Sequence, residues 1–130
     1  MKYFSYDEFD SPDELGSGKH MDHDLLVMID RARALYGKPI VVTSGFRTES
    51  HNEKVGGVAS SSHLKGLAID VACVRSKDRF EMLTALLEVG FNRVGVASTF
   101  IHVDVDKNKS QNVIWTCLLY TSPSPRDYPG

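Results

Sequence analysis

The sequence is short of cysteine, which excludes several classes of protein. Its two cysteines, Cys73 and Cys117, lack the CxxC spacing of redox and zinc motifs and are too few for a disulfide framework. We expect Cys73 to be a small buried apolar residue, so we do not expect catalysis by a thiolate.

The sequence also has no large excess of charge of one sign and no long apolar segment. The 15 basic and 17 acidic side chains give a formal net charge of −2 and form no basic tract, which argues against nucleic acid or an anionic membrane as the partner. The start of the chain, MKYFSYDE, has no apolar run that could act as a signal peptide, and no later segment approaches membrane-spanning length. We therefore expect synthesis in the cytoplasm, no membrane insertion, a monomer, and a small or uncharged substrate.

The 130 residues are enough for one globular domain. With 42% hydrophobic and 25% charged residues, they can build a single core. Residues 117–130 change abruptly to a Ser- and Pro-rich composition that cannot continue a strand, and they resemble a translated sequencing adaptor. We assign residues 1–116 to the domain and 117–130 to a non-native or disordered tail, so Cys117 carries no weight.

Apolar spacing predicts two main helices. Residues 21–36 have apolar positions at a 3.6-residue period and end before Gly37, a natural helix stop. Residues 76–89 repeat this pattern, with Ser76 as a candidate N-cap and Gly90 at the end. Alternating or β-branched runs predict a small antiparallel sheet, with strands at 39–43, 67–72, 94–97, 101–105 and 113–115.

The segment from Ser44 to Asp70 concentrates the residues that could do chemistry. Residues 45–66 are rich in Gly, Ser, Thr and Asn, and a loop of that length implies a function, such as forming one wall of a cleft. His63 and Asp70 stand seven apart across Gly66. One of them would lie on a turn and the other inside the next strand, on a face with only small neighbours.

His102 could complete a metal site with these two residues. It is the only histidine in the second half of the chain, and it lies in the alternating pattern of a half-buried strand. Zinc binds His nitrogen and Asp oxygen, and a catalytic zinc keeps three protein ligands and one water whose pKa falls to about 7. The alternative is that the three residues share no role. His63 would then be a loop histidine, Asp70 a turn or capping carboxylate and His102 a solvated strand residue. We expect the remaining histidines at the surface: His20, His23 and His51.

Five motifs together resemble a known family. They are SGFRT at 44–48, HN at 51–52, VGGV at 55–58, SSHLKGLAID at 61–70 and IHVD at 101–104. These motifs resemble those of the zinc D-alanyl-D-alanine carboxypeptidases and the related phage L-alanyl-D-glutamate endopeptidases, together called the LAS-type metallopeptidases. The resemblance covers about residues 8–116. The resemblance implies that one Zn²⁺ is bound by His63, Asp70 and His102. It also implies an α+β fold in which helices pack on one side of a small antiparallel sheet, with the zinc site in a cleft on the sheet.

The resemblance also assigns roles to Arg47 and Ser61. Arg47 matches the family arginine that faces the substrate, and its guanidinium suits a peptide carboxylate or the oxyanion of a tetrahedral intermediate. A loop-stabilising ion pair is the alternative. Ser61 matches the family serine two residues before the first ligand and is expected to bond the substrate backbone, although a plain loop serine is equally consistent.

The general base is where this sequence departs from the family. Several relatives, including the vancomycin-resistance dipeptidases, have Glu or Asp three residues before the second histidine ligand, where this chain has Thr99. On a strand, Asp104 shares a face with His102, so we predict that Asp104 is the general base. Its alternative role is to orient a ligand histidine. Asp106, nearer the strand end, is a weaker candidate base.

The sequence therefore predicts a zinc-dependent hydrolase that cuts the stem peptide of bacterial peptidoglycan, as a D-Ala-D-Ala carboxypeptidase or an L-Ala-D-Glu endopeptidase. The lack of a signal peptide and of wall-binding repeats favours a phage endolysin that reaches the cell wall through holin pores, or a bare catalytic module. Because of Thr99, a catalytically inactive zinc-containing binding module stays open as an alternative. A virion structural component of the same fold is a third possibility.

Overall fold

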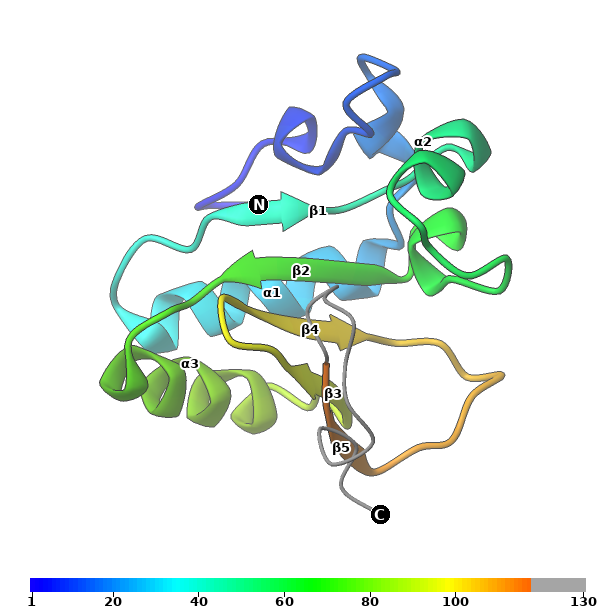
Figure 1. Cartoon of the computed structure of the whole chain (residues 1–130). Helices are drawn as coiled ribbons and strands as arrows, with labels where there is room; N and C mark the ends of the chain where they lie inside the picture. Colours follow the sequence, from blue (N-terminus) through cyan, green and yellow to red (C-terminus); the bar gives the residue numbers. More distant parts are fainter. Residues whose placement is uncertain (118–130) are drawn as a thin grey trace.

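The computed structural model describes residues 1–117; residues 118–130, which make up nearly all of the expected tail, lie outside the described part. The described residues form an α+β fold with three α-helices, three 3-10 helices and five strands (Figure 1). In chain order these are η1 (Tyr6–Phe9), η2 (Ser17–His20), α1 (His23–Tyr36), β1 (Val42–Ser44), α2 (Glu49–Lys54), η3 (Ser62–Lys65), β2 (Ala68–Ala72), α3 (Ser76–Glu88), β3 (Arg93–Val96), β4 (Phe100–Asp104) and β5 (Val113–Thr116).

The five strands form one sheet in the order β1-β2-β4-β3-β5. The first four strands in this order form three antiparallel pairs, as expected, but β5 pairs with β3 in parallel. The expectation of a purely antiparallel sheet is therefore wrong, and the sheet is mixed. Because β4 already has β2 on one edge and β3 on the other, the segment 105–112 carries the chain from β4 across β3 to the free edge of β3. After this reversal β5 runs opposite to β4, as β3 does, so β3 and β5 are parallel.

The two main helices occur where the apolar spacing predicts them. Helix α1 begins one residue after Asp22, whose carboxylate accepts a hydrogen bond from the backbone N–H of Leu25 at 3.0 Å. It ends at Gly37, which has φ +76°. The prediction that Ser76 caps helix α3 is wrong. Ser76 is already helical, and Arg75 occupies the N-cap position without a side-chain hydrogen bond.

The sheet has one apolar face and one polar face. The alternate residues Ile69, Val71, Ile101 and Val103 are fully buried and belong to the same core as the inner faces of α1 and α3. Helices α1 and α3 also pack on each other, and α1 runs behind β2 and β4 (Figure 1). The residues between these positions, including Asp70, point to the other face, where the functional side chains gather.

The loop between β1 and β2 is not structureless. It contains α2 and η3, two short helices that the sequence did not predict and that lie at the end of the sheet where β1 ends and β2 begins (Figure 1). Helix α2 is capped by Thr48, whose hydroxyl accepts from the N–H of His51 at 3.1 Å. Strand β1 starts at Val42 and not at residue 39, although the carbonyl of Val41 already accepts from the N–H of Ala72 at 2.9 Å.

Among the described residues, no helix is both long enough and apolar enough to cross a membrane.

Candidate metal centre

His63 lies on η3, a single helical turn that is fixed at both ends. At the start, the Ser61 hydroxyl accepts from the backbone N–H of His63 at 3.3 Å. At the end, Gly66 has φ +71°, and a Cβ at this position would lie 2.2 Å from the carbonyl oxygen of His20. Only glycine fits there. The chain then enters β2 directly, which places His63 beside the strand that carries Asp70.

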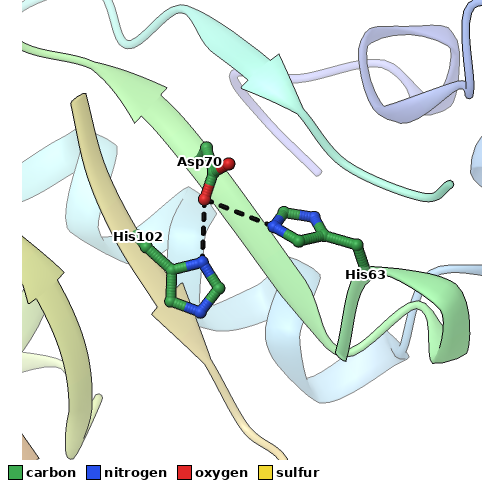
Figure 2. A group of neighbouring side chains, drawn as sticks. All are labelled: His63, Asp70 and His102. Carbon is green, nitrogen blue, oxygen red and sulfur yellow. Dashed lines mark hydrogen bonds and ion pairs between the residues drawn. The ribbon is translucent and has the colours of Figure 1, made fainter. Parts of the chain in front are cut away.

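Asp70 and His102 are direct partners across the pairing of β2 with β4. Figure 2 shows the three side chains converging, with Asp70 between the two imidazole rings. Asp70 Oδ1 lies 2.8 Å from His102 Nδ1 and 3.3 Å from His63 Nε2. One ligand atom from each residue lies within 4.8 Å of the others. The structure thus brings together the three residues that the motif singles out.

The outer nitrogen of each histidine makes a hydrogen bond that fixes the position of its proton. His63 Nδ1 lies 2.8 Å from the carbonyl oxygen of Gly45, which can only accept, so Nδ1 carries the proton. His102 Nε2 lies 2.7 Å from Asp104 Oδ2, and the carboxylate again accepts. In a neutral ring the inner nitrogen then has only a lone pair, and on both rings that nitrogen faces Asp70.

Three acceptors that face one another need a cation between them. The cation can be a proton on a ring or a metal ion, and two imidazole nitrogens with one carboxylate oxygen are a ligand set that zinc accepts. Each ring also has the outer hydrogen-bond partner that is typical of a metal-binding histidine. The residues present therefore fit Zn²⁺.

The ionisation of the cluster agrees with such a cation. Burial alone would raise the pKa of Asp70, but the hydrogen bonds that His102 and His63 donate when their inner nitrogens carry a proton outweigh it and hold the pKa well below its usual range. Burial alone would lower the pKa of His102, yet the bonds to Asp104 and Asp70 raise it above the ordinary histidine value. A carboxylate that stays ionised at this position favours any cation that binds next to it.

Arg47 borders the cluster on the side of Asp70. Its Nη2 lies 3.6 Å from Asp70 Oδ2, while Nε and Nη1 donate to Ser44 Oγ at 3.0 Å and Asn52 Oδ1 at 3.2 Å. Burial lowers the pKa of Arg47, and the charge of Asp70 opposes that shift. The guanidinium is therefore held in one orientation beside the candidate metal ligands, with part of its side chain still accessible to solvent.

Asp104 does share a face with His102, but it is not open to solvent. Asp104 is 1% exposed, and both of its carboxylate oxygens accept hydrogen bonds. Oδ2 accepts from His102, whereas Oδ1 accepts from Arg93 Nε at 2.6 Å and from the backbone N–H of Asp106 at 3.2 Å. Burial alone would raise the pKa of Asp104, but the bonds from His102 and Arg93 lower it. These contacts match the orienting role better than that of a base that reaches a substrate.

Asp106 is likewise committed to the protein. Its fully buried carboxylate accepts from Ser62 Oγ at 2.7 Å and from Lys65 Nζ at 3.2 Å. Ser62 and Lys65 lie on η3, on either side of His63 in the sequence. Asp106 therefore ties the turn that carries His63 to the end of the strand that carries His102.

Two further neighbours of the cluster were not predicted from the sequence. Arg93 on β3 is buried against Asp104, and the ring of Trp115 on β5 lies 5.7 Å from that of His102 between centroids. The residue after β5, Cys117, donates its N–H to the carbonyl of Val96 at 2.8 Å and so continues the pairing with β3. A charged residue in an otherwise apolar strand was the one sequence signal that could have pointed to Arg93.

The other candidate residues lie apart from the cluster. Thr99 is exposed in the turn between β3 and β4, and its carbonyl accepts from the N–H of Cys73. Cys73 is buried, as expected, and burial raises the pKa of its thiol. His20 and His23 are exposed, as expected, whereas His51 is half-buried.

The chain belongs to the peptidase M15 family. A sequence model of this family, described as Peptidase M15, matches residues 2–104. This is the family of the zinc D-Ala-D-Ala carboxypeptidases and the LAS-type peptidases, so the resemblance inferred from the motifs is confirmed. The matched range includes His63, Asp70, His102 and Asp104. A comparison with curated proteins finds no match.

Proposed function

We propose that this protein is a zinc metallopeptidase that hydrolyses the stem peptide of bacterial peptidoglycan, as a D-Ala-D-Ala carboxypeptidase or an L-Ala-D-Glu endopeptidase. Membership of the M15 family supports a peptidase. The observation that carries the proposal is the convergence of His63, Asp70 and His102, with the outer nitrogen of each ring already bonded and the inner nitrogen turned toward Asp70.

In this proposal the zinc would be held by His63 Nε2, an oxygen of Asp70 and His102 Nδ1. When bound there, zinc supplies a Lewis acid that polarises a carbonyl and acidifies water. The protein's own contribution begins with orientation. The Gly45 carbonyl and Asp104 keep the two rings in the tautomers that present the inner nitrogens, and Asp106 holds η3 against β4.

Arg47 is proposed to bind the substrate. Its guanidinium can donate two parallel hydrogen bonds to a carboxylate or stabilise the charge that develops on the carbonyl oxygen of the scissile bond. The bonds to Ser44 and Asn52 hold it in place before substrate arrives. Ser61 has a contact with His63 that supports a structural role, and bonding to the substrate backbone stays a proposal for this residue.

The contacts of Asp104 decide which role we propose for it. Asp104 is enclosed by His102, Arg93 and the backbone of Asp106, so we propose that it orients His102 and leave the base role as the alternative. Within residues 1–117, the hydrogen bonds and ion pairs of the three candidate ligands reach no carboxylate other than Asp70 and Asp104. This feature favours a second candidate function, a zinc-containing binding or virion structural module without catalysis.

Digestion of purified murein sacculi tests the proposal. We expect the zinc-loaded protein to release D-alanine or peptide fragments, and we expect a chelator or the His63→Ala substitution to abolish release. Mass analysis of the fragments identifies the bond: loss of a terminal D-Ala indicates a carboxypeptidase, and separation of L-Ala from D-Glu indicates an endopeptidase. A zinc-loaded protein that releases nothing from sacculi would favour the binding module.

The proposal also includes three expectations from the sequence. The protein is a phage enzyme, it reaches the cell wall through holin pores, and it is a monomer with a single domain at residues 1–116. For an endolysin of this kind we expect lysis when the protein is produced in bacteria together with a holin, and no lysis when it is produced without one.

A further inference from the structure

Arg93 lies behind the candidate metal centre, separated from His102 by one carboxylate. Its Nε donates to Asp104 Oδ1 at 2.6 Å, and Asp104 Oδ2 lies 2.7 Å from His102 Nε2. Arg93 is 8% exposed and Asp104 is 1% exposed, so the bond between them is largely shielded from water. The three side chains form a continuous line from β3 to the ring that faces Asp70.

Asp104 needs a cation at this position. A carboxylate buried to this degree is strongly disfavoured unless it is paired and hydrogen-bonded. Within the described residues, Arg93 is the charged partner on Oδ1, because the second donor to that oxygen is the neutral backbone N–H of Asp106. With Oδ1 occupied in this way, Oδ2 remains as the acceptor for His102.

Arg93 is itself held by groups outside β3. Its Nη1 donates to the carbonyl of Ser110 in the segment between β4 and β5, and its guanidinium carbon lies 4.9 Å from the centre of the Trp115 ring. The same ring lies 5.7 Å from that of His102. The guanidinium therefore cannot turn away from Asp104 without breaking contacts with two other parts of the chain.

We propose that Arg93 is a positioning residue for the metal centre, which acts through Asp104 to hold His102 with Nδ1 toward Asp70. This inference rests on the proposed function, because it assumes that His102 is a metal ligand. Among the described residues, no hydrogen bond or ion pair joins Arg93 directly to a candidate ligand. Its contribution is to the affinity for zinc, through the tautomer and the orientation of one ring.

Zinc affinity measured by competition with a chromophoric chelator tests this role. We expect Arg93→Gln to weaken zinc binding about 10- to 100-fold, the usual effect of losing an outer partner of a ligand. Arg93→Lys keeps the charge and one donor, so it should recover part of that loss. Arg31→Gln, at an exposed position on α1, is the matched control and should bind zinc as the unsubstituted protein does.

A double-mutant cycle separates positioning from general support of the fold. Because Arg93 acts through Asp104, adding Arg93→Gln to Asp104→Asn should cause no further loss of zinc affinity. The double variant also leaves no unpaired buried charge, so it is the one expected to fold if Arg93→Gln alone does not. An equal loss from Arg93→Gln with and without Asp104→Asn would overturn the proposal, as would unchanged zinc affinity in Arg93→Gln.

The same measurements separate this inference from the proposed function. If the unsubstituted protein binds no zinc, or if His63→Ala binds it equally well, the proposed metal centre is wrong. If zinc binds through His63 but does not respond to Arg93, only the positioning role is wrong.

Discussion

At the scale of single residues, the chemistry of the centre depends on which nitrogen of each imidazole is free. The Gly45 carbonyl binds Nδ1 of His63, so His63 presents Nε2 to Asp70. The Asp104 carboxylate binds Nε2 of His102, so His102 presents Nδ1. We predict that His63→Ala and His102→Ala each fall well below one equivalent of zinc in metal analysis. Full retention of one equivalent in both variants would contradict the assignment, whereas partial retention would not.

Arg47 offers a test of substrate binding that leaves the metal in place. A lysine cannot reproduce the bidentate donor geometry of arginine. We therefore expect Arg47→Lys to lower activity at least tenfold, about 1.4 kcal/mol in the barrier, with the zinc content unchanged. Arg31→Lys on the exposed side of α1 is the control. Unaltered kinetics would instead assign Arg47 to the ion pair and hydrogen bonds of its loop.

Asp104→Asn distinguishes the two roles considered for this carboxylate. Asparagine keeps an acceptor for His102 but removes the charge that pairs with Arg93. We expect zinc affinity to fall about 10- to 100-fold, with most turnover restored when zinc is saturating. Normal zinc affinity with nearly all turnover lost would support Asp104 as the general base.

At the scale of elements, one ion-pair cluster joins the end of α1 to the start of α3. Lys38, which follows α1, has its ammonium nitrogen 2.6 Å from Asp78 Oδ1 and 2.8 Å from Glu81 Oε1. The hydrogen bond from Lys38 lowers the pKa of Asp78 below its ordinary value of 3.8. The three side chains are only partly buried, so the effect of the cluster should shrink as salt is added.

The lowered pKa of Asp78 predicts a pH dependence. A carboxylate whose pKa is lower in the folded state stabilises the protein above its unfolded pKa, and this contribution is lost as the pH falls through the folded value. Asp78→Asn should therefore reduce the loss of unfolding free energy below about pH 4, as followed by urea denaturation at several pH values. Lys38→Gln should give the same change, because it removes the cause of the shift. An unchanged acid dependence in both variants would contradict this prediction.

At the scale of the whole molecule, the sheet separates stability from chemistry. Its apolar face packs on α1 and α3, and its other face carries Asp70 and His102. Leu86 on α3 is fully buried in that core, whereas its neighbour Leu87 is 43% exposed. Leu86→Ala should cost about 2–5 kcal/mol of unfolding free energy, and Leu87→Ala should stay within about 0.5 kcal/mol, both measured by denaturant unfolding. Equal effects would mean that the core is not where the structure places it.

The sequence by itself determined the parts of this protein that depend on spacing along the chain. Periodicities of 3.6 and 2 are local properties, so the helix at 21–36 and the strand around Asp70 follow from the order of apolar and polar residues alone. The candidate ligands could be found for a related reason. His63, Asp70 and His102 lie in motifs whose residue types and spacing belong to one family.

Only the tertiary structure decided which segments meet. Strand β5 pairs in parallel with β3 because β2 and β3 already occupy both edges of β4. No local sequence pattern shows which strands occupy those edges. The bond from His63 to the Gly45 carbonyl has no sequence signature, because every residue carries a backbone carbonyl. Arg93 acquires its place beside Asp104 through strand pairing over 11 positions, which brings a charged strand residue close to the candidate metal centre.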